Sequence, residues 1–306
     1  MNQQTIKAKT VVMISFTSPH QEKYRLTLWQ LAEWIEYNLH GAITLPEIEQ
    51  KTGYCARHLY TLFYTHFGIS IAGYIRKRRL TLASVMLRET RRSVTEIAFM
   101  YNFDHLQTFS RAFKDHFGLS PQSYRRAERW DMARYYPSVT VKKPASKITL
   151  CHIDKNHYLK IKTKKNYHID FGYNFLLATK KMEIISYPQV YRDFIELIFS
   201  NDLEPPLTVY GELIPGKNCD TEIDLYIGVL KHNITDCDDI RIPAGNYARF
   251  CFTGTPEDLM KYQTWAKGHG MQQYKFIMRK GPTFSVFNKT MTPGVFSSEY
   301  YIPVSF

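Results

Sequence analysis

The chain has 306 residues, of which 44% are hydrophobic and 22% charged, and this composition is typical of globular proteins long enough for two domains. No apolar run approaches the ~20 residues of a membrane span, which argues against a membrane protein. The five cysteines form no CxxC pair and no zinc spacing, and their number is odd. We therefore expect reduced thiols, no metal or other cofactor, and a cytoplasmic location.

The net charge of +12 is concentrated in the first half of the chain. Residues 1–148 hold 22 Lys and Arg against 11 Asp and Glu, whereas the remainder is close to neutral. This asymmetry indicates a polyanionic partner for the first half, although a merely soluble basic surface would give the same balance.

The first regular element that the pattern predicts is an amphipathic helix. Residues 1–24 contain a short β-prone run and indicate no role, so we treat them as an N-terminal extension. From Leu26 to Leu39 apolar residues recur at helical spacing, and Gly41 ends the run.

Residues 44–67 predict a helix, a tight turn and a second helix. Thr44 and Glu47 have the spacing of a capping box, and Gly53 supplies the positive φ of the turn. The second helix, from about Cys55 to Phe67, buries one face. The side chains left for its other faces are Arg57, His58, Tyr60 and Thr61. This is the geometry of a helix-turn-helix unit, and a helical hairpin without a DNA role is the alternative.

Residues 70–89 predict a long helix whose middle is the basic run Arg76 to Arg79. Such a run is either a solvated basic face or, beside a groove-binding unit, a set of phosphate contacts. Arg76 is our candidate for a phosphate contact.

The pattern of residues 44–74 then recurs. Ser93 and Glu96 form a second potential capping box, and Asn102 occupies the turn position because asparagine tolerates left-handed backbone. The following helix, about His105 to Phe117, leaves a mostly polar set outside. The side chains left outside are Leu106, Gln107, Ser110, Arg111 and Lys114. Two such units on one rigid helix can reach successive major grooves about 34 Å apart, so the duplication favours binding to double-stranded DNA.

Residues 26–126 resemble the DNA-binding domain of the AraC/XylS family of bacterial transcription regulators. The segments that carry the resemblance are GYCARHLYTLFYTHFG, YIRKRRL and NFDHLQTFSRAFKDHFGLSPQSYRR. The resemblance implies a monomer on an asymmetric site of about two helical turns, and activation of transcription through contact with RNA polymerase.

The contact residues are only partly those that the resemblance implies. Family members use Trp, Gln and Arg in the first recognition helix, where this chain has Arg57, Tyr60 and Thr61. The second helix matches or nearly matches at Gln107, Thr108, Ser110 and Arg111. Because Arg can pair with guanine and Gln with adenine, we expect base contacts from Arg57 and Arg111, with phosphate contacts as their alternative, and Gln107 and Tyr60 are further candidates. We expect His58 to pack or to contact a phosphate, and Lys114 completes the predicted DNA-binding set.

The second half of the chain predicts an α+β domain with an antiparallel sheet. After the helical domain of residues 25–130, residues 131–147 are typical of an extended basic linker, and residues 148–306 form the second domain. Its predicted strands are 147–153, 158–162, 207–214, 223–230, 246–253, 283–288 and 297–304, with helices at 190–199 and 256–267.

This element order, with the segments VYGELIP, IPAGNYARFCFTG and SSEYYIPV, resembles a GyrI-like effector domain. The resemblance implies a central aromatic groove that holds a small hydrophobic or cationic molecule. The candidate ligand-binding residues are Tyr226, Trp265, Glu299 and Tyr301. Aromatic faces and a carboxylate both attract a cation, but core aromatics and a solvent-facing Glu are the alternatives.

An enzyme is poorly supported. Cys151 and His152 are neighbours on a predicted strand and point to opposite faces, which argues against a nucleophile–base pair. The sequence has no HExxH, no GxSxG and no glycine-rich phosphate loop, so we assign no catalytic residue. The function predicted is a DNA-binding transcription regulator with a sensor domain. A GyrI-like hydrolase or a drug-sequestering protein fused to a DNA-binding domain is the alternative.

Overall fold

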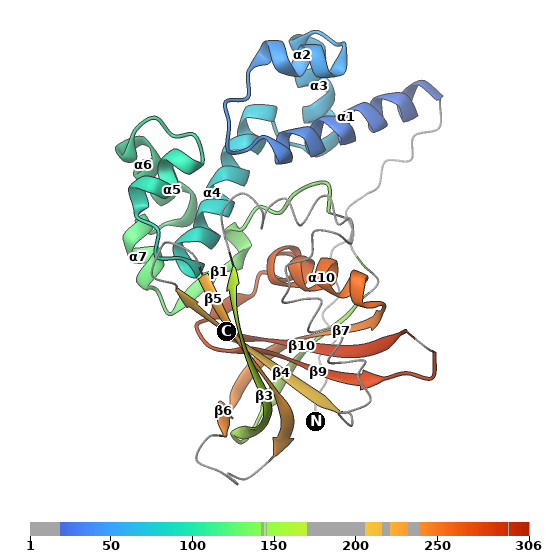
Figure 1. The fold of residues 1–306 in the computed structure, drawn as a ribbon. Coiled ribbons are helices and arrows are strands. Elements are labelled where there is room, and N and C mark those ends of the chain that lie inside the picture. Colours follow the sequence, from blue (N-terminus) through green and yellow to red (C-terminus); the bar gives the residue numbers. More distant parts are fainter. Residues whose placement is uncertain are drawn as a thin grey trace.

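The computed structural model describes residues 19–141, 144, 146–169, 206–215, 221–231, 239–292 and 294–305. They form a helical part and a part built on a large antiparallel sheet (Figure 1). The helical part consists of α1 (Pro19–Tyr37), α2 (Leu45–Thr52), α3 (Ala56–Phe67), α4 (Ile71–Glu89), α5 (Val94–Met100), α6 (Leu106–Phe117) and α7 (Pro121–Arg126).

The predicted caps and turns of both helix-turn-helix units are confirmed. The Thr44 amide donates to Glu47 Oε2 at 2.8 Å, and the Ser93 amide donates to Glu96 Oε2 at 2.7 Å. In the turns, Gly53 has φ 72° and Asn102 has φ 58°, so both positions have the left-handed backbone that the sequence predicts. These local signals fix where α2 and α5 begin and how each turn leads into the next helix.

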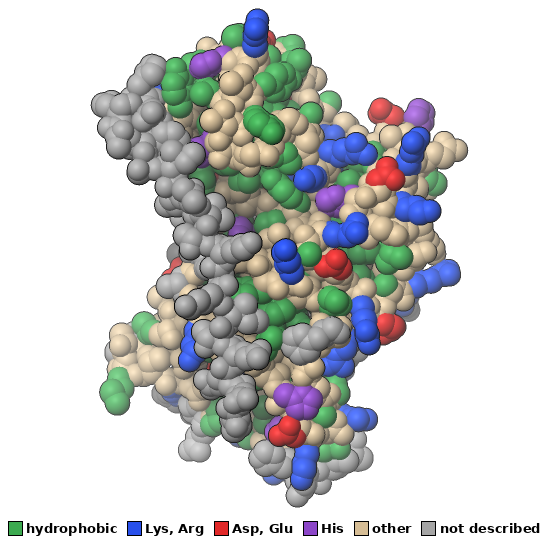
Figure 2. All heavy atoms as spheres, turned by 180° about the vertical axis from the view of Figure 1, so that it is seen from behind, with side chains coloured by type: hydrophobic (Ala, Val, Ile, Leu, Met, Phe, Trp, Pro, Cys, Tyr) green, Lys and Arg blue, Asp and Glu red, His purple; other side chains and the backbone are tan. Residues whose placement is uncertain are grey.

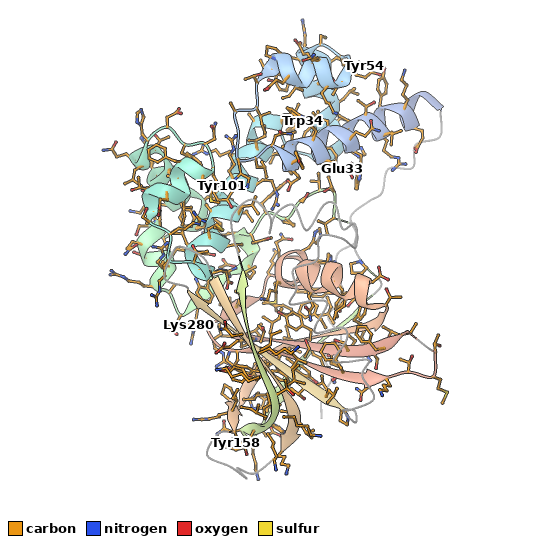
Figure 3. All side chains as sticks on the ribbon, in the orientation of Figure 1. Glu33, Trp34, Tyr54, Tyr101, Tyr158 and Lys280 are labelled. Carbon is orange, nitrogen blue, oxygen red and sulfur yellow. The ribbon has the colours of Figure 1, made fainter. Side chains whose placement is uncertain are left out.

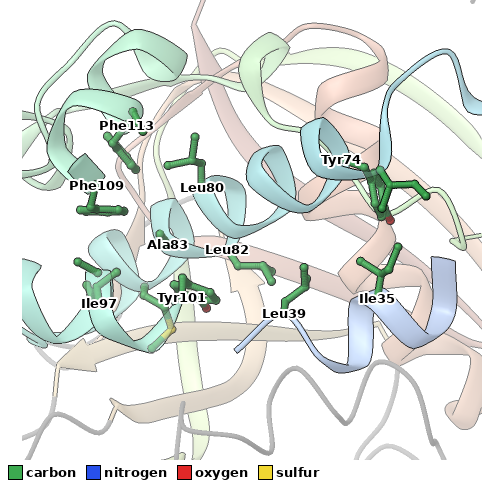
Figure 4. Close-up of a cluster of buried hydrophobic side chains, with 14 of the residues drawn as sticks. Ile35, Leu39, Tyr74, Leu80, Leu82, Ala83, Ile97, Tyr101, Phe109 and Phe113 are labelled. Carbon is green, nitrogen blue, oxygen red and sulfur yellow. The ribbon is translucent and has the colours of Figure 1, made fainter. Parts of the chain in front are cut away.

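One hydrophobic core holds the two units at the two ends of α4 (Figure 4). Tyr74 of α4 packs near Ile35 of α1, and Leu80 of α4 faces Phe109 and Phe113 of α6 in this view. All five side chains are almost completely buried. Because the core is continuous along α4, the positions of α3 and α6 relative to each other are set by one rigid helix.

One arginine of the basic run in α4 is buried and its neighbour is half-buried, which neither sequence interpretation anticipated. Arg78 is 5% exposed and forms an ion pair with Glu36 of α1, with its Nε 2.8 Å from Oε1 and its Nη2 2.9 Å from Oε2. Arg79 donates to the main-chain oxygens of Leu39 and Gly41. Arg78 and Arg79 therefore tie α4 to α1 and its C-terminal turn, and only Arg76 of the run is exposed.

The first helix begins at Pro19, earlier than the expected start at Leu26 and inside the predicted N-terminal extension. Residues 19–25 are polar and show no apolar period, so periodicity alone does not reveal them. The Arg25 guanidinium donates to the Glu22 carboxylate one turn earlier at 2.9 Å, an exposed contact that supports the added turn.

The sheet consists of ten described strands, and every pairing between them is antiparallel. They are β1 (Arg129–Asp131), β2 (Lys147–Ile153), β3 (His157–Ile169), β4 (Leu207–Pro215), β5 (Thr221–Lys231), β6 (Ile240–Ile242), β7 (Gly245–Gly254), β8 (Ile277–Arg279), β9 (Thr283–Lys289) and β10 (Phe296–Ser305). The main path of pairing is β1-β8-β10-β9-β4-β5-β3-β6, and β7 lies between β10 and β2.

The α+β prediction is confirmed, and all seven predicted strands are present. The helix predicted at 256–267 is α10 (Pro256–Trp265), and it continues through a π-helical turn (Ala266–Gly270) into α11 (Met271–Gln273). Sequence reasoning missed β1, β6 and β8, because three residues are too few to show an alternation of period two. The helix predicted at 190–199 lies outside the described residues.

The segment after β1, predicted to be part of a linker, is packed against the helical core. It begins with the 3-10 turn Met132–Arg134, in which Met132 is buried among residues of the sheet part. The Tyr136 amide donates to Thr81 Oγ1 of α4, and the Tyr136 carbonyl accepts from Arg78. Residues 132–136 therefore form the connection between the two parts, and hydrogen bonds hold this segment against α4.

Strand β1 joins the two parts directly. It follows α7 and pairs with β8, so Trp130 lies opposite Met278. The Trp130 side chain belongs to the helical core, while Lys280 donates its amide to the Glu128 carbonyl at 2.8 Å at the same junction (Figure 3). In the described part of the chain, no helix is long and apolar enough to cross a membrane.

Candidate DNA-binding interface and effector face

The exposed side of α3 is a single stripe that contains three of the four predicted contact residues. Arg57, Tyr60 and Thr61 are exposed, while Leu59 and Phe63 on the opposite side are fully buried. The Thr61 hydroxyl donates to the Arg57 carbonyl at 3.2 Å, so part of its hydrogen-bonding capacity is used within the helix. A spacing of three and four residues places these side chains on one face.

His58 lies off this stripe. Its ring packs against Tyr24 of α1 and Tyr54 of the turn, with ring centroids 5.5 Å apart in both pairs. This packing gives His58 a role between α1 and the turn, and the structure does not group it with the stripe that Arg57 begins.

Sequence reasoning missed two exposed residues on this side of α3, Tyr64 and Thr65. Tyr64 is 61% exposed and follows Tyr60 by one helical turn and Arg57 by two. The signal was available in the sequence, since Tyr64 has the same helical phase as Arg57.

Helix α6 presents a more polar set. Gln107, Thr108, Arg111 and Lys114 are exposed and Ser110 is half-buried. Phe109, Ala112 and Phe113 bury the opposite side in the core. In the view from behind, Lys and Arg side chains gather on the flank formed by α5 to α7, and hydrophobic side chains are more prominent over α2 and α3 (Figure 2).

The predicted ligand-binding residues fall on two faces of the sheet. Tyr226, Glu299 and Tyr301 lie on the face that also carries Tyr210, Tyr247 and Phe284, which we call the aromatic face. The ring of Tyr301 stacks on Phe284 with centroids 4.5 Å apart and an interplanar angle of 6°.

Trp265 lies on the other face and does not join this group. It is 2% exposed and packs against Phe250 and Tyr262 between α10 and the sheet. Successive residues of a strand alternate between the two faces of the sheet, so neighbouring strand residues can be assigned to opposite faces. Trp265 is on a helix, and the sequence does not specify which face of the sheet that helix covers. Trp265 is therefore packed in the core, in the layer opposite Tyr226, Glu299 and Tyr301.

Two carboxylates of the aromatic face, Glu299 and Asp224, already have partners. Glu299 accepts from Arg249 Nη1 at 3.5 Å and from the Tyr301 hydroxyl at 2.6 Å. Burial, and then the hydrogen bond to Glu299, raise the pKa of Tyr301, so its hydroxyl is a donor at neutral pH. Arg249, which sequence reasoning missed, occupies the position expected for a ligand cation.

A similar arrangement surrounds Tyr226. The Lys164 ammonium lies 5.0 Å from the centre of the Tyr226 ring and 3.0 Å from Asp224. The hydrogen bond from Asn166, together with those from Lys164 and Tyr226, holds the pKa of Asp224 below its usual value. The aromatic face thus combines the half-buried rings of Tyr226 and Tyr301 with the paired carboxylates of Asp224 and Glu299.

The described residues give no support for covalent catalysis by the cysteines of the sheet. Burial raises the pKa of both the Cys151 and the Cys251 thiol, which disfavours the nucleophilic thiolate. His152 is exposed on the opposite side of β2 and contacts Asn246. In the described part of the chain no group of three or more His, Cys, Asp and Glu has the arrangement of a metal site.

Comparison with known proteins places the helical part in a family. A model described as a helix-turn-helix domain matches residues 48–127. The Transposon Tn10 TetD protein of Escherichia coli is 42% identical over 99 residues, which are 32% of this chain and 72% of TetD. The chain belongs to the AraC/XylS family.

Two further relatives match the same region of this AraC/XylS member. The putative HTH-type transcriptional regulator YkgA of Escherichia coli is 44% identical over 115 residues, 38% of this chain and 48% of YkgA. Transcriptional regulator Rob of Salmonella typhimurium is 42% identical over 97 residues, 32% of this chain and 34% of Rob. The chain thus matches about half of YkgA and a third of Rob, and its curved antiparallel sheet with α10 on one face is consistent with a GyrI-like domain.

Proposed function

We propose that this AraC/XylS protein is a sequence-specific DNA-binding transcription regulator that inserts α3 and α6 into adjacent major grooves of one duplex. The observation that carries the proposal is the pair of exposed stripes, one on each helix, held at the two ends of α4 by a single core. Helix α4 has 19 residues and is about 28 Å long at ~1.5 Å per residue. That length is close to the ~34 Å between successive major grooves on one face of DNA.

In this arrangement the domains are residues 25–130 for DNA binding and 148–306 for sensing, and one chain binds an asymmetric site as a monomer. The protein then activates transcription by contact with RNA polymerase in the bacterial cytoplasm. The family membership and the two-unit architecture support this, and transcription in vitro from a promoter next to the bound site tests it. A rise in transcript that depends on the protein is expected; a fall would show a repressor.

Footprinting on genomic fragments at moderate salt tests DNA binding itself. We expect one protected site of about 20 base pairs, or two helical turns, per monomer. Protection of all fragments alike, with a steep salt dependence and no preferred site, would show nonspecific binding to phosphates and would overturn the proposal.

Arg111→Ala should weaken binding to the specific site by about five- to 150-fold, corresponding to ~1–3 kcal/mol for a bidentate base contact. Binding to random DNA should change little, because a base contact contributes only at the correct sequence. Gel-shift titration of both duplexes measures this. The matched control is Lys160→Ala, which removes one exposed positive charge from β3. An equal loss on both duplexes would instead assign Arg111 to a phosphate.

The sheet domain, in our proposal, senses a small hydrophobic or cationic molecule at the aromatic face. Tyr226, Glu299 and Tyr301 supply the surface, and Arg249 must leave Glu299 before a ligand cation can bind there. A ligand that binds only the native state raises the melting temperature, so a thermal-shift screen with hydrophobic cations and isosteric neutral compounds tests the idea.

In that screen, Arg249→Gln should increase the shift given by cations, and Glu299→Gln should abolish the difference between a cation and its neutral isostere. No shift with any compound in the parent or the variants would contradict the sensor role. Chemical turnover of a compound by the protein, or uptake without any effect on DNA affinity, would instead support a hydrolase or a sequestering protein fused to the DNA-binding domain.

A further inference from the structure

The exposed stripe of α3 is dominated by two tyrosines. Tyr60 is 37% and Tyr64 is 61% exposed, and together they form what we call the aromatic ridge. The ridge is not needed for the core, because Leu59 and Phe63 fill that side of α3 completely. Tyr60 and Tyr64 are adjacent on one face of α3, and contiguous exposed apolar surface, unlike single exposed apolar side chains, can mark a contact site.

The two recognition helices differ in chemistry. The exposed set of α6 can make several hydrogen bonds to base edges, since it contains Gln107 and Arg111. On α3 the only charged member of the stripe is Arg57, and the Thr61 hydroxyl is bonded to the helix itself. Most of the remaining contact area of α3 is the two tyrosine rings, so apart from Arg57 and the hydroxyls of Tyr60, Tyr64 and Thr65 the first helix has few hydrogen-bonding groups for telling one base pair from another.

We propose that the aromatic ridge reads thymine methyl groups in the half-site bound by α3, with Tyr64 as a specificity residue beside Tyr60. This rests on the proposed binding of α3 in a major groove. Among the bases, thymine alone presents a methyl group in that groove, and apolar side-chain atoms recognise it by excluding water from it.

The spacing of the stripe fits such a reading. Arg57 and Tyr64 are seven residues apart on α3, about 10 Å along the helix axis, which is about three base-pair steps. Arg57 can therefore contact a guanine at one end while Tyr60 and Tyr64 contact thymines further along the groove. The predicted half-site is a guanine followed by an A·T-rich stretch.

Deoxyuridine substitution tests the proposal, because it removes the methyl group and leaves the Watson–Crick and major-groove hydrogen-bonding groups unchanged. The preferred site is first selected from random duplexes, and the α3 half is assigned as the half in which Arg57→Ala relaxes specificity. Each contacted thymine in that half is then replaced by deoxyuridine. We expect about fourfold weaker binding for each methyl group removed.

Matched substitutions distinguish a contact made by the tyrosine ring from one made by its hydroxyl. Tyr64→Phe removes only the hydroxyl, so its binding should still weaken when thymine is replaced by deoxyuridine. Tyr64→Ser and Tyr60→Ser remove a ring, so in each variant deoxyuridine should no longer weaken binding at the one thymine that this ring contacts. Since both tyrosines are exposed, circular dichroism and the melting temperature should be those of the parent. Deoxyuridine outside the protected site, measured in the same series, should have no effect.

Three results would overturn the proposal. Undiminished binding to deoxyuridine duplexes by the parent shows that no methyl group is read. Loss of affinity in Tyr64→Phe for every sequence alike assigns the hydroxyl to a phosphate. Normal DNA binding with lost transcription in Tyr64→Ser assigns the ridge to a protein partner. In all three cases a specific site is still selected, so only the absence of any selected site counts against DNA recognition itself.

Discussion

Replacing Arg78 by Met should destabilise the helical domain by about 3–5 kcal/mol, because the change leaves the Glu36 carboxylate buried without its cation. Both side chains of this ion pair are 7% exposed. Arg78 also donates to the Tyr136 carbonyl at 2.7 Å, and the Tyr74 hydroxyl donates to Glu36 at 2.6 Å. The single substitution therefore disrupts a hydrogen-bond network that joins α1, α4 and the segment of residues 132–136 after β1.

Urea denaturation followed by circular dichroism measures this loss. Arg76→Met is the matched control, since Arg76 is exposed on the same helix and its removal should change stability by less than about 0.5 kcal/mol. The double variant Glu36→Leu/Arg78→Met should recover much of the loss, because replacing both members of a buried ion pair by apolar residues is often close to neutral. If Arg78→Met and Arg76→Met unfold at the same urea concentration, the buried network contributes nothing and the prediction is wrong.

The same residue shows where reading the sequence succeeds and where it fails. Capping boxes and left-handed turns involve residues within a few positions of one another, so Thr44 with Glu47 and the turn at Asn102 were predictable. The partners of Arg78 are 42 and 58 residues away, and a run of four basic residues carries no sign of them. Helical phase gave the one usable hint, since Tyr74 and Arg78 are four residues apart on the buried side of α4.

The sheet domain shows the same division between local and distant information. Seven strands were predictable because each is long enough to alternate between its faces. Which aromatic residues share a face depends on the pairing order of strands far apart in the chain. The sequence therefore did not show that Tyr226 and Tyr301 lie on the same face as Glu299, or that Trp265, on a helix, belongs to the opposite layer.

Strand β1 gives the sheet a direct connection to the DNA-binding helices. Val304 of β10 pairs with Met278 of β8, which in turn pairs with Trp130 of β1. Glu299 and Tyr301 of the aromatic face are also on β10. Only β8 lies between β10 and β1, the strand whose Trp130 side chain packs in the helical core. A ligand that shifts β10 has in this ladder a contiguous route to the helical core.

Replacing Trp130 by Ala should interrupt this route and lower the stability of the helical domain by about 3–5 kcal/mol, as expected when a buried aromatic side chain is removed. Trp130 is 8% exposed, its indole Nε1 donates to the Tyr124 carbonyl at 3.1 Å, and the Arg88 guanidinium lies 5.1 Å from its ring centre. The side chain thus packs with α4 and α7, while its backbone belongs to the sheet. Calorimetry should show the helical part of Trp130→Ala melting separately, at a lower temperature than the sheet.

Two control variants test whether the loss of stability comes from the Trp130 indole itself. Trp130→Phe retains a ring but loses the hydrogen bond to Tyr124, so its loss should be smaller, and Arg129→Ala alters an exposed neighbour in the same strand and should have little effect. A single unchanged transition in Trp130→Ala would mean that Trp130 does not couple the two parts. If instead Trp130→Phe folds normally but any effect of ligand on DNA affinity disappears, the packing of this one side chain is what transmits a change in β10 to α4. Regulation would then depend on the contact between sheet and core rather than on a change within either recognition helix.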